Sequence, residues 1–243
     1  MENPVEPVIV AIDGPSGTGK SSTSRAVAAR LGLSYLDTGA MYRAITWWML
    51  GNGVAVDDPV AVADQAGKPV IVSGTDPGAP TITVDGVDVS VPIRSQEVTA
   101  AVSAVSAVPE VRARLVEMQR AAAAAPSAAA GIVVEGRDIG TTVLPDATVK
   151  VFLTASAEAR AARRSVELKG AVTVADTQAA LIRRDAADSG RKTSPLAKAA
   201  DAIEVDTTEL NLEQVVEHVV ALVREKQPAA APAAAAVEET TPR

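Results

Sequence analysis

A glycine-rich segment containing one lysine has the residue types that point most directly to chemistry. It reads Gly14-Pro15-Ser16-Gly17-Thr18-Gly19-Lys20-Ser21, the pattern of a phosphate-binding loop, or P-loop. Glycines allow successive backbone N–H groups to point at phosphate oxygens, and the following helix adds its N-terminal dipole. We predict that Lys20 binds the β- and γ-phosphates of a nucleoside triphosphate and that Ser21 binds Mg²⁺. The predicted nucleotide-binding residues are Gly14, Pro15, Ser16, Gly17, Thr18, Gly19, Lys20, Ser21 and Ser22.

Polar and charged residues follow two further apolar runs that are typical of strands. The first run is followed by Asp37 and Thr38 and, about one helical turn later, by Arg43; the second is followed by Gly136, Arg137 and Asp138. In an open α/β sheet, ligands bind beyond the carboxyl ends of the strands. The Thr38 hydroxyl and the Arg43 guanidinium could together hold an anionic substrate that receives the phosphoryl group. Arg137 would clamp a phosphate, and the neighbouring Asp138 would accept a hydrogen bond from the same ligand.

These residues also have plainer interpretations. Arg43 is compatible with a solvated helix position, and Arg137 with Asp138 is compatible with an internal salt bridge. A P-loop alone does not choose between small-molecule kinases, ATP-driven machines and nucleotide-operated switches. The sequence has no Asn-Lys-x-Asp motif for reading guanine. That favours a kinase, although a kinase for another small acceptor stays open.

Strand and helix patterns alternate along the chain, as expected for an α/β fold. Continuous apolar runs are typical of parallel strands that are covered on both faces. The predicted strands are residues 8–12, 33–36, 131–134, 149–153 and 202–205. Helices are expected over 21–31, where Gly32 would end the helix, over 41–50, and from a capping box at 211–214 to about 226. We therefore predict a P-loop kinase fold with a five-stranded parallel sheet flanked by helices.

Two segments interrupt this alternation. Residues 68–97 contain short strand-like pieces around the turn signal Asp85-Gly86, which predicts a small antiparallel insert. Residues 157–200 contain arginine-rich helical segments without a strand, which suits a mobile helical lid. The kinase domain is expected over residues 8–226, between a flexible N-terminus (1–7) and a disordered tail rich in alanine and proline (227–243).

Composition narrows the class of protein. The 243 residues have a net charge of -7, which argues against general nucleic-acid binding. The sequence contains no cysteine, no secretory signal pattern and no apolar run long enough, at about 18 residues, to span a membrane. We therefore expect a cytoplasmic monomer that binds neither membranes nor nucleic acid. If its ligands are anions, its cations must be gathered locally against the overall charge.

Several motifs in a fixed order resemble the bacterial cytidylate kinases, which are P-loop members of the nucleoside monophosphate kinase family. The matching stretches are Ile12-Asp13-Gly14-Pro15-Ser16-Gly17, Leu36-Asp37-Thr38-Gly39-Ala40-Met41-Tyr42-Arg43, Ile93-Arg94-Ser95-Gln96-Glu97-Val98, Glu135-Gly136-Arg137-Asp138-Ile139-Gly140-Thr141, Pro145-Asp146-Ala147, and Arg183-Arg184-Asp185 to Pro195-Leu196. They cover the chain from about Val8 to Arg224. The resemblance implies phosphorylation of CMP and dCMP to CDP and dCDP in pyrimidine nucleotide metabolism, with ATP as donor and Mg²⁺ as metal.

The resemblance also implies roles for individual residues. Positions that hold the α-phosphate of the acceptor are matched by Thr38, Arg43 and Arg137. Positions that read the cytosine base are matched by Ser103, Arg112 and Asp138. Positions around the sugar and the phosphates are matched by Arg184, Asp188 and Arg191. These types suit the ligand, because the exocyclic amine of cytosine needs a carboxylate acceptor and its ring acceptors need donors. Two departures from some relatives are Thr38 in place of serine and Ala186-Ala187 in place of charged residues.

Phosphoryl transfer depends on in-line placement and on neutralising charge, with little covalent chemistry from side chains. We predict Lys20, Arg137 and Arg184 as the catalytic cations. Further candidates at helical spacing in the predicted lid are Arg160, Arg163 and Arg164, which a solvated cationic helix face would explain equally well.

Some residues have ordinary alternatives outside a site. Arg112, taken alone, would be an exposed helix residue. His218, the only histidine, is expected on the surface, and Trp47 and Trp48 are expected in the core.

Overall fold

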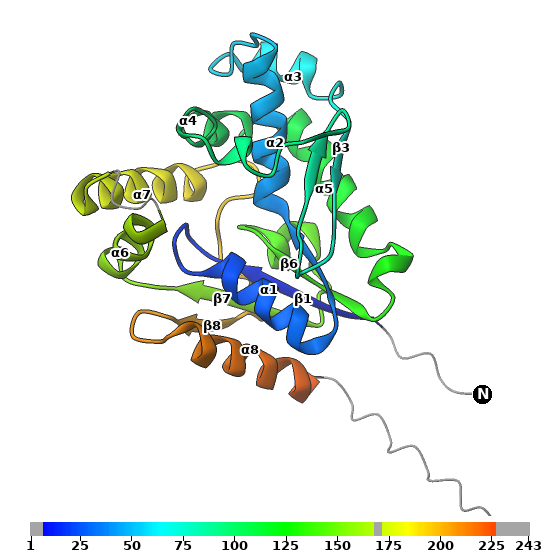
Figure 1. Cartoon of the computed structure of the whole chain (residues 1–243), viewed down its shortest axis with the longest axis vertical. Coiled ribbons are helices and arrows are strands. Elements are labelled where there is room, and N and C mark those ends of the chain that lie inside the picture. Colours follow the sequence, from blue (N-terminus) through cyan, green and yellow to red (C-terminus); the bar gives the residue numbers. More distant parts are fainter. Residues whose placement is uncertain (1–6, 168–171, 227–243) are drawn as a thin grey trace, which may run out of the picture.

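A five-stranded parallel sheet forms the centre of the computed structural model, which describes residues 7–167 and 172–226 (Figure 1). The strand order is β2-β6-β1-β7-β8. The strands are β1 (Val8–Asp13), β2 (Ser34–Asp37), β6 (Gly131–Glu135), β7 (Val149–Thr154) and β8 (Ile203–Asp206). The predicted sheet is therefore confirmed, with each strand within a residue or two of its expected position. The predicted disordered tail and all but the last residue of the predicted flexible N-terminus lie outside the described residues.

Aliphatic side chains cover both faces of this sheet, which explains why its strands are apolar throughout. On one face, α1 (Lys20–Leu31) and α8 (Leu212–Lys226) pack through valines such as Val27 and Val216. On the other face lie α2 (Thr38–Gly51) and α5 (Pro109–Ala123), and α3 (Pro59–Gln65) and α4 (Gln96–Val105) pack on these helices as part of the same hydrophobic cluster. Trp47 and Trp48 pack, partly buried, against this second cluster, and His218 is exposed, so both predictions are confirmed.

Caps determine where two of the helices begin and end. The Asp37 carboxylate accepts a hydrogen bond from the Ala40 N–H over 2.9 Å, so α2 begins at Thr38 and contains the whole of the helix expected over 41–50. At the end of α1, Gly32 adopts a left-handed φ of 65°, as the sequence predicts. The start of α2 matters for the site, because it places Thr38 directly at the carboxyl end of β2.

The predicted antiparallel insert is present as the sheet β3 (Ile71–Ser73), β4 (Ile82–Val84) and β5 (Val87–Asp88). The β4–β5 turn has left-handed φ values of 51° at Asp85 and 81° at Gly86, as its sequence predicts. The loop after β3 reaches back to the main sheet, where the Thr75 carbonyl accepts from the Tyr35 N–H of β2 over 2.8 Å. Arg25 of α1 donates to two carbonyls of the same loop. The insert is thus held against the β2 edge of the parallel sheet.

Helices α6 (Ala157–Glu167) and α7 (Val174–Ser189) pack against each other beside the P-loop (Figure 1). They occupy the segment predicted as a helical lid, and no strand is found among its described residues. Three single helical turns complete the chain: η1 (Pro92–Arg94), η2 (Pro126–Ala128) and η3 (Ile139–Val143). Across residues 7–167 and 172–226, no helix combines the length and the apolar character needed to cross a membrane.

Candidate active site

The P-loop joins the central strand β1 to α1, and its shape depends on glycine at two close approaches. Gly14 has a φ of 146°, and a Cβ there would collide with the Leu153 carbonyl of β7. Gly17 has a φ of 83° and lies against the backbone and Cβ of Arg160 in α6. Any larger residue at either position would push the loop away from its neighbours. The loop therefore keeps the tight curvature that a phosphate cradle requires.

Lys20 is buried at the start of α1, and its Nζ lies 2.5 Å from the Pro15 carbonyl oxygen. Burial lowers its pKa below the usual range, and repulsion from Arg137 adds to the effect. A buried ammonium that faces other cations is electrostatically unfavourable unless an anion lies between them. The arrangement is suited to a polyanionic ligand.

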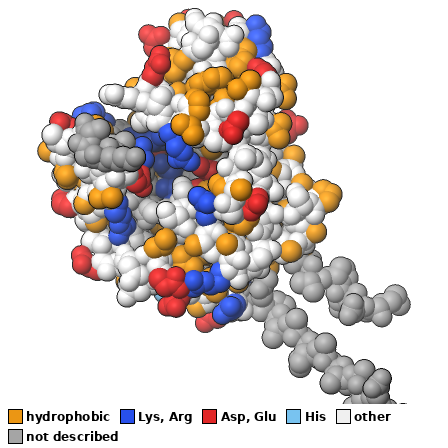
Figure 2. All heavy atoms as spheres, in the orientation of Figure 1, with side chains coloured by type: hydrophobic (Ala, Val, Ile, Leu, Met, Phe, Trp, Pro, Cys, Tyr) orange, Lys and Arg blue, Asp and Glu red, His pale blue; other side chains and the backbone are white. Residues whose placement is uncertain are grey.

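A cavity of about 460 Å³ opens over the P-loop. Its basic lining residues are Lys20, Arg25, Arg43, Arg94, Arg137, Arg164 and Arg184. Figure 2 shows Lys and Arg side chains gathered in this hollowed part of the surface. Burial is the main cause that lowers the pKa of Arg43 to about 10 and that of Arg184 to about 9, and repulsion from neighbouring arginines is the second cause. The local gathering of cations expected for an acidic protein with anionic ligands is thus present.

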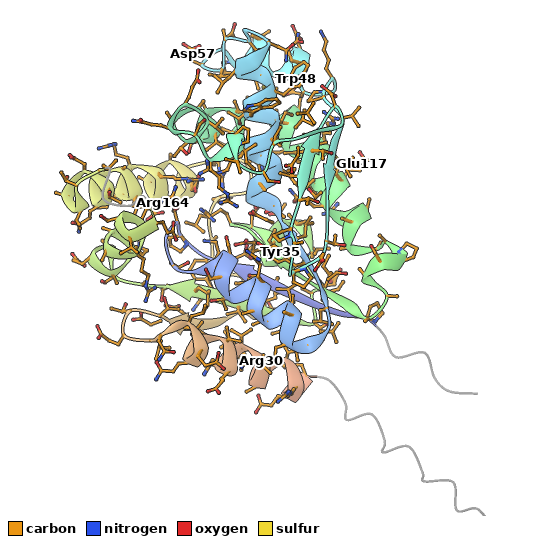
Figure 3. The ribbon with its side chains drawn as sticks, in the orientation of Figure 1. Arg30, Tyr35, Trp48, Asp57, Glu117 and Arg164 are labelled. Carbon is orange, nitrogen blue, oxygen red and sulfur yellow. The ribbon has the colours of Figure 1, made fainter. Side chains whose placement is uncertain are left out.

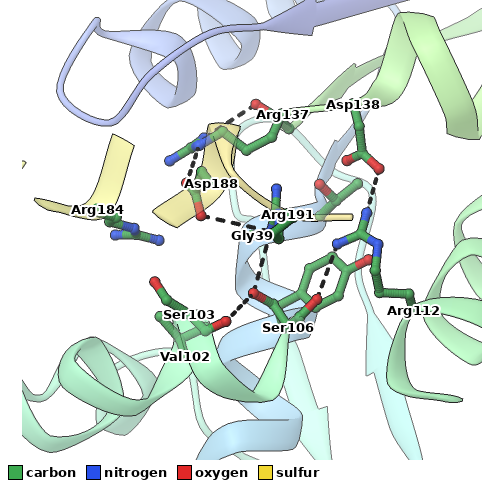
Figure 4. A pocket seen from close by; sticks show the side chains of 13 residues that line it. Gly39, Val102, Ser103, Ser106, Arg112, Arg137, Asp138, Arg184, Asp188 and Arg191 are labelled. Atoms are coloured by element: carbon green, nitrogen blue, oxygen red, sulfur yellow. Dashed lines mark hydrogen bonds and ion pairs between the residues drawn. The ribbon is translucent and has the colours of Figure 1, made fainter. Parts of the chain in front are cut away.

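A second cavity of about 60 Å³ adjoins the first and contains most of the predicted acceptor-binding residues (Figure 4). The predicted residues that line it are Thr38, Ser103, Arg112, Arg137, Asp138, Arg184, Asp188 and Arg191. Arg43, predicted with them, lies instead in the larger cavity, where its guanidinium donates to the Ile93 carbonyl and the Thr99 hydroxyl. The two cavities share Gly39, Gly136, Arg137 and Arg184. They are therefore two parts of one cleft, and two of the predicted catalytic arginines lie where the parts meet.

Arg112 and Asp138 form a buried ion pair on the wall of the small cavity, with side chains 3% and 7% exposed (Figure 4). The Arg112 guanidinium also lies 5.3 Å above the centre of the Tyr42 ring and donates to the Ser106 carbonyl over 3.2 Å. The alternative that Arg112 is an exposed helix residue is wrong. The alternative that Arg137 and Asp138 form internal salt bridges holds for each residue but not between them, because Asp138 pairs with Arg112 and Arg137 pairs with Asp188.

Asp188 of α7 connects the helical pair to the end of β6. Its Oδ2 lies 3.2 Å from Nε of Arg137, and its Oδ1 lies 3.6 Å from Nη1 of Arg191 (Figure 4). Arg191 also reaches the Ser106 hydroxyl over 3.4 Å. Four buried guanidinium nitrogens on the described residues that line the small cavity lack a hydrogen-bond partner, namely Nε of Arg112, Arg184 and Arg191 and Nη2 of Arg191. Unpaired buried donors that line one cavity are suited to hold a polar ligand.

The three arginines of α6 have different surroundings. Arg164 lines the P-loop cavity and pairs with Glu167 over 2.6 Å (Figure 3). Arg160 is buried, donates to the Ser16 carbonyl of the P-loop over 3.2 Å and pairs with Asp185 of α7. Arg163 instead binds the backbone around Thr207, after β8. The expectation that this trio could act together at phosphates therefore has to be corrected for Arg163, whose guanidinium is occupied by main-chain carbonyls.

Sequence reasoning missed the carboxylates beside the P-loop. Glu135, the last residue of β6, lines the P-loop cavity, as does Asp37. Glu135 accepts a hydrogen bond from the Tyr35 hydroxyl, and burial raises the pKa of its carboxyl to about 7. Ser21 lines the same cavity as these two carboxyl groups. Both acids stand at strand ends, so the rule that singled out Thr38 and Arg137 would also have found them.

The same residues offer a small set of hard oxygen ligands. No group of three or more acidic or histidine side chains that could hold a metal occurs within the described ranges. A hydroxyl and one or two carboxylates fit Mg²⁺, which keeps several waters and takes its other ligands from substrate phosphates.

The chain was compared with known proteins. A family model described as "Cytidylate kinase" matches residues 10–225. Proteins named "Cytidylate kinase" from Streptomyces coelicolor and Streptomyces avermitilis are 75% and 73% identical to the chain, covering 93% of it and 99% and 96% of the relatives. A solved structure of an uncharacterized protein from Eubacterium ventriosum has a TM-score of 0.50 at 10% identity, covering 90% of this chain and 99% of that one, which is a likeness of fold alone.

Proposed function

The chain belongs to the cytidylate kinase family, and from this premise we propose that it transfers the γ-phosphoryl group of ATP to CMP and dCMP, giving CDP and dCDP. The observation that carries the proposal is the junction of the two cavities. Arg137 and Arg184 lie in both, with the P-loop on one side and the buried Arg112–Asp138 pair on the other. This is the arrangement that a two-substrate phosphoryl transfer requires.

In this proposal the small cavity holds the nucleoside of the acceptor. The Asp138 carboxylate accepts from the exocyclic amine of cytosine, and Arg112 and Ser103 donate to the ring acceptors. Asp188 and Arg191 lie at the sugar. Because the Arg112 guanidinium is held by Asp138, Tyr42 and the Ser106 carbonyl, it is oriented before the ligand arrives. Preorganised polar groups lose less entropy on binding and therefore discriminate better.

The acceptor phosphate is proposed to lie among the cations at the junction. Thr38 at the start of α2 and Arg137 at the end of β6 approach it from the sheet, and Arg43 approaches from α2. The free energy released when the anion enters includes relief of the repulsion that lowers the pKa values of Arg43 and Arg184. Binding of the acceptor is therefore driven strongly by electrostatics and should weaken as salt is added.

ATP is proposed to lie with its phosphates in the P-loop, where Lys20 neutralises the charge that develops on the transferring group. Residues Gly14 to Ser22 supply the cradle. Arg137 and Arg184 face the same group from the acceptor side, so charge is neutralised from both directions. Mg²⁺ would be held by Ser21, with Glu135 and Asp37 close enough to bind its waters, and it supplies further charge neutralisation when bound. The protein's own part is to place the two substrates in line and to exclude water.

Helices α6 and α7, within the predicted lid (157–200), are proposed to cover the junction when both substrates are bound. Arg160 and Asp185 connect the two helices to the P-loop, so the pair responds to the donor side. Closure removes water, which is a competing acceptor. We further propose that the kinase domain spans residues 8–226 and that the enzyme works as a cytoplasmic monomer without nucleic acid. One chain supplies both cavities, and a chain without cysteine suits a reducing compartment.

The test is an ADP-release assay with CMP, dCMP, UMP, AMP and shikimate as acceptors. The expected result is efficient turnover with CMP and dCMP and much weaker turnover with the others. If CMP stimulates ADP release no more than AMP or shikimate does, the cytidylate assignment is wrong. Turnover with none of the five would instead favour a nucleotide-binding switch.

A further inference from the structure

A buried carboxylate joins the two halves of the cleft without lining either cavity. Asp13 is the last residue of β1, directly before Gly14, and it is 5% exposed. Its Oδ1 accepts from the Ile139 N–H over 2.9 Å, and its Oδ2 accepts from the Gly140 N–H over 2.8 Å. These two N–H groups open η3, the single π-helical turn that follows Asp138. One side chain thus links the residue before the P-loop to the turn beside the base-reading carboxylate.

The turn needs this carboxylate because Asp138 does not cap it. Asp138 stands at the N-cap position of η3, where an aspartate ordinarily binds the first free N–H groups of its own helix. Here its carboxylate is turned away and pairs with Arg112, and it makes no cap hydrogen bond. Asp13, at the end of β1, accepts the hydrogen bonds from these N–H groups instead. The consequence is that the Asp138 carboxylate is not used for capping and stays paired with Arg112 on the wall of the small cavity.

The far end of the same turn is held as well. Arg120 of α5 donates from Nε to the Val143 carbonyl and from Nη2 to the Thr142 carbonyl, both over 2.8 Å. Gly140 packs so closely on the Lys150 side chain that a Cβ there would lie 3.1 Å from its Cδ. Since the turn is fixed at both ends and on its side, a displacement of Asp13 is transmitted to it rather than absorbed.

Burial disfavours the charged form of the Asp13 carboxyl, because the carboxylate loses its hydration. Loss of solvent raises the pKa of its carboxyl to about 6, against the two backbone hydrogen bonds and Lys20, which lower it. A neutral residue of similar size would avoid that desolvation cost, but it could not accept from both N–H groups at once. This combination is typical of a residue retained for the geometry that it imposes.

We propose that Asp13 is a positioning residue that couples donor binding to acceptor recognition, by tying the start of the P-loop to the turn that carries Asp138. Nucleotide contact at Gly14 to Lys20 shifts or stiffens the end of β1, and the carboxylate passes that change to Ile139 and Gly140. When ATP is bound, the turn thereby holds Asp138 in the position that binds cytosine, and the affinity for CMP rises. This inference rests on the proposed function, in which the two cavities hold ATP and CMP.

The direct test measures the affinity for CMP with and without saturating AMP-PNP, by calorimetry, in the wild type, Asp13→Asn, Asp13→Ala and Asp58→Asn. In the wild type, AMP-PNP should tighten CMP binding. The coupling factor is the ratio of the CMP dissociation constants without and with AMP-PNP, and it should fall toward one in Asp13→Asn and reach one in Asp13→Ala. Asp58→Asn is the matched control, because Asp58 also accepts a helix-opening N–H, at α3, and lies in neither cavity. It should keep the wild-type factor.

A second readout does not depend on catalysis. Hydrogen exchange in the peptide 137–144 should be slowed by AMP-PNP in the wild type and in Asp58→Asn, and not in Asp13→Asn. A wild type that fails to phosphorylate CMP would refute the proposed function, whereas this exchange measurement still decides the coupling. If AMP-PNP protects the peptide equally in the wild type and in Asp13→Asn, the proposal is overturned. Equal weakening of CMP and AMP-PNP binding with an unchanged coupling factor would also overturn it, since Asp13 would then be merely structural.

Should Asp13→Asn not fold, as judged by circular dichroism, Gly140→Ala perturbs the turn that Asp13 holds. The new methyl group would be in ordinary contact with Asp13 Oδ2, at 3.5 Å, but only 3.1 Å from Cδ of Lys150, so the Lys150 stem or the turn has to give way by a few tenths of an ångström. We expect a partial loss of coupling with the fold intact. A full wild-type coupling factor in this variant would count against the proposal.

Discussion

Replacement of Asp138 by alanine should damage the use of CMP far more than the binding of ATP. Asp138 lines the small cavity and does not line the P-loop cavity. Its carboxylate is the proposed acceptor for the exocyclic amine of cytosine, and UMP has a carbonyl at that position. In the variant, kcat/KM should therefore fall for CMP much more than for ATP, and the preference for CMP over UMP should become smaller.

The magnitude follows from the burial of the ion pair. A hydrogen bond to a charged group contributes about 1.5–3 kcal/mol, so kcat/KM for CMP should fall roughly 10- to 200-fold. A second, separate cost arises because Arg112 is only 3% exposed and would keep a buried charge without its partner. Breaking a buried pair in this way lowers the free energy of unfolding by about 3–5 kcal/mol.

Steady-state kinetics with CMP, UMP and ATP as the varied substrates, together with thermal unfolding, separate the two costs. The double variant Arg112→Met/Asp138→Leu removes both charges and should recover much of the stability without recovering the use of CMP. Glu213→Ala is the matched control for loss of a carboxylate from an ion pair, because the side chains of Glu213 and its partner Arg30 are 61% and 38% exposed and line neither cavity. It should change stability by less than about 1 kcal/mol and leave the kinetics unchanged.

One result would refute the role given to Asp138. If Asp138→Ala raises the KM values for ATP and CMP by the same factor and leaves the ratio of CMP to UMP use unchanged, the carboxylate only supports the fold. Recovery of CMP use in the double variant would lead to the same conclusion.

Three further predictions concern other parts of the cleft. Lys20→Ala should lower kcat by about 10²-fold or more while circular dichroism and the melting temperature show an intact fold, because the buried ammonium acts on the transferring phosphoryl group; turnover near that of the wild type would contradict this. Folding raises the pKa of the Glu135 carboxyl from 4.5 to about 7, so its native state binds the proton more tightly, and the free energy of unfolding should fall by up to about 3 kcal/mol as the pH rises between these values. Glu135→Gln should flatten that part of a pH–stability curve measured by urea unfolding, and an unchanged curve would exclude this source. Arg163→Met should lower the melting temperature but keep both nucleotide KM values within about twofold, since Arg163 binds carbonyls around Thr207 and not the cleft; a large rise in either KM would restore it as a phosphate ligand.

The fold was largely predictable because its signals are local. Continuous apolar runs, a glycine-rich turn and the Asp85-Gly86 hairpin each indicate their own conformation, and the structure confirms them. Boundaries moved where a side chain competed with the pattern. The clearest case is Asp37, which caps α2 and starts it three residues before the first apolar residue of the predicted helix.

The site was predictable only in part, because its charged residues act through partners that are distant in the sequence. Arg163 has the type and the helical spacing of a phosphate ligand, yet its guanidinium donates to the hydroxyl and the carbonyl of Thr207, which follows β8. Asp13 shows the opposite error. In the sequence it stands only as one residue of a motif, since nothing local reveals that Ile139 and Gly140 lie within hydrogen-bonding distance of its carboxylate. The type of a residue predicts which interactions its side chain can make, but only the fold determines which partner it makes them with.

The loop that follows β3 has a consequence for solubility. Strand β2 is at one end of the parallel sheet, and an open strand edge is a template on which another chain can pair. The hydrogen bond from the Tyr35 N–H to the Thr75 carbonyl occupies part of that edge, and the two hydrogen bonds from Arg25 keep the loop in place. The insert therefore covers part of an edge on which another chain could pair. A shortened enzyme without residues 73–81 should aggregate at concentrations at which the full chain stays dispersed, even if its cleft is undamaged.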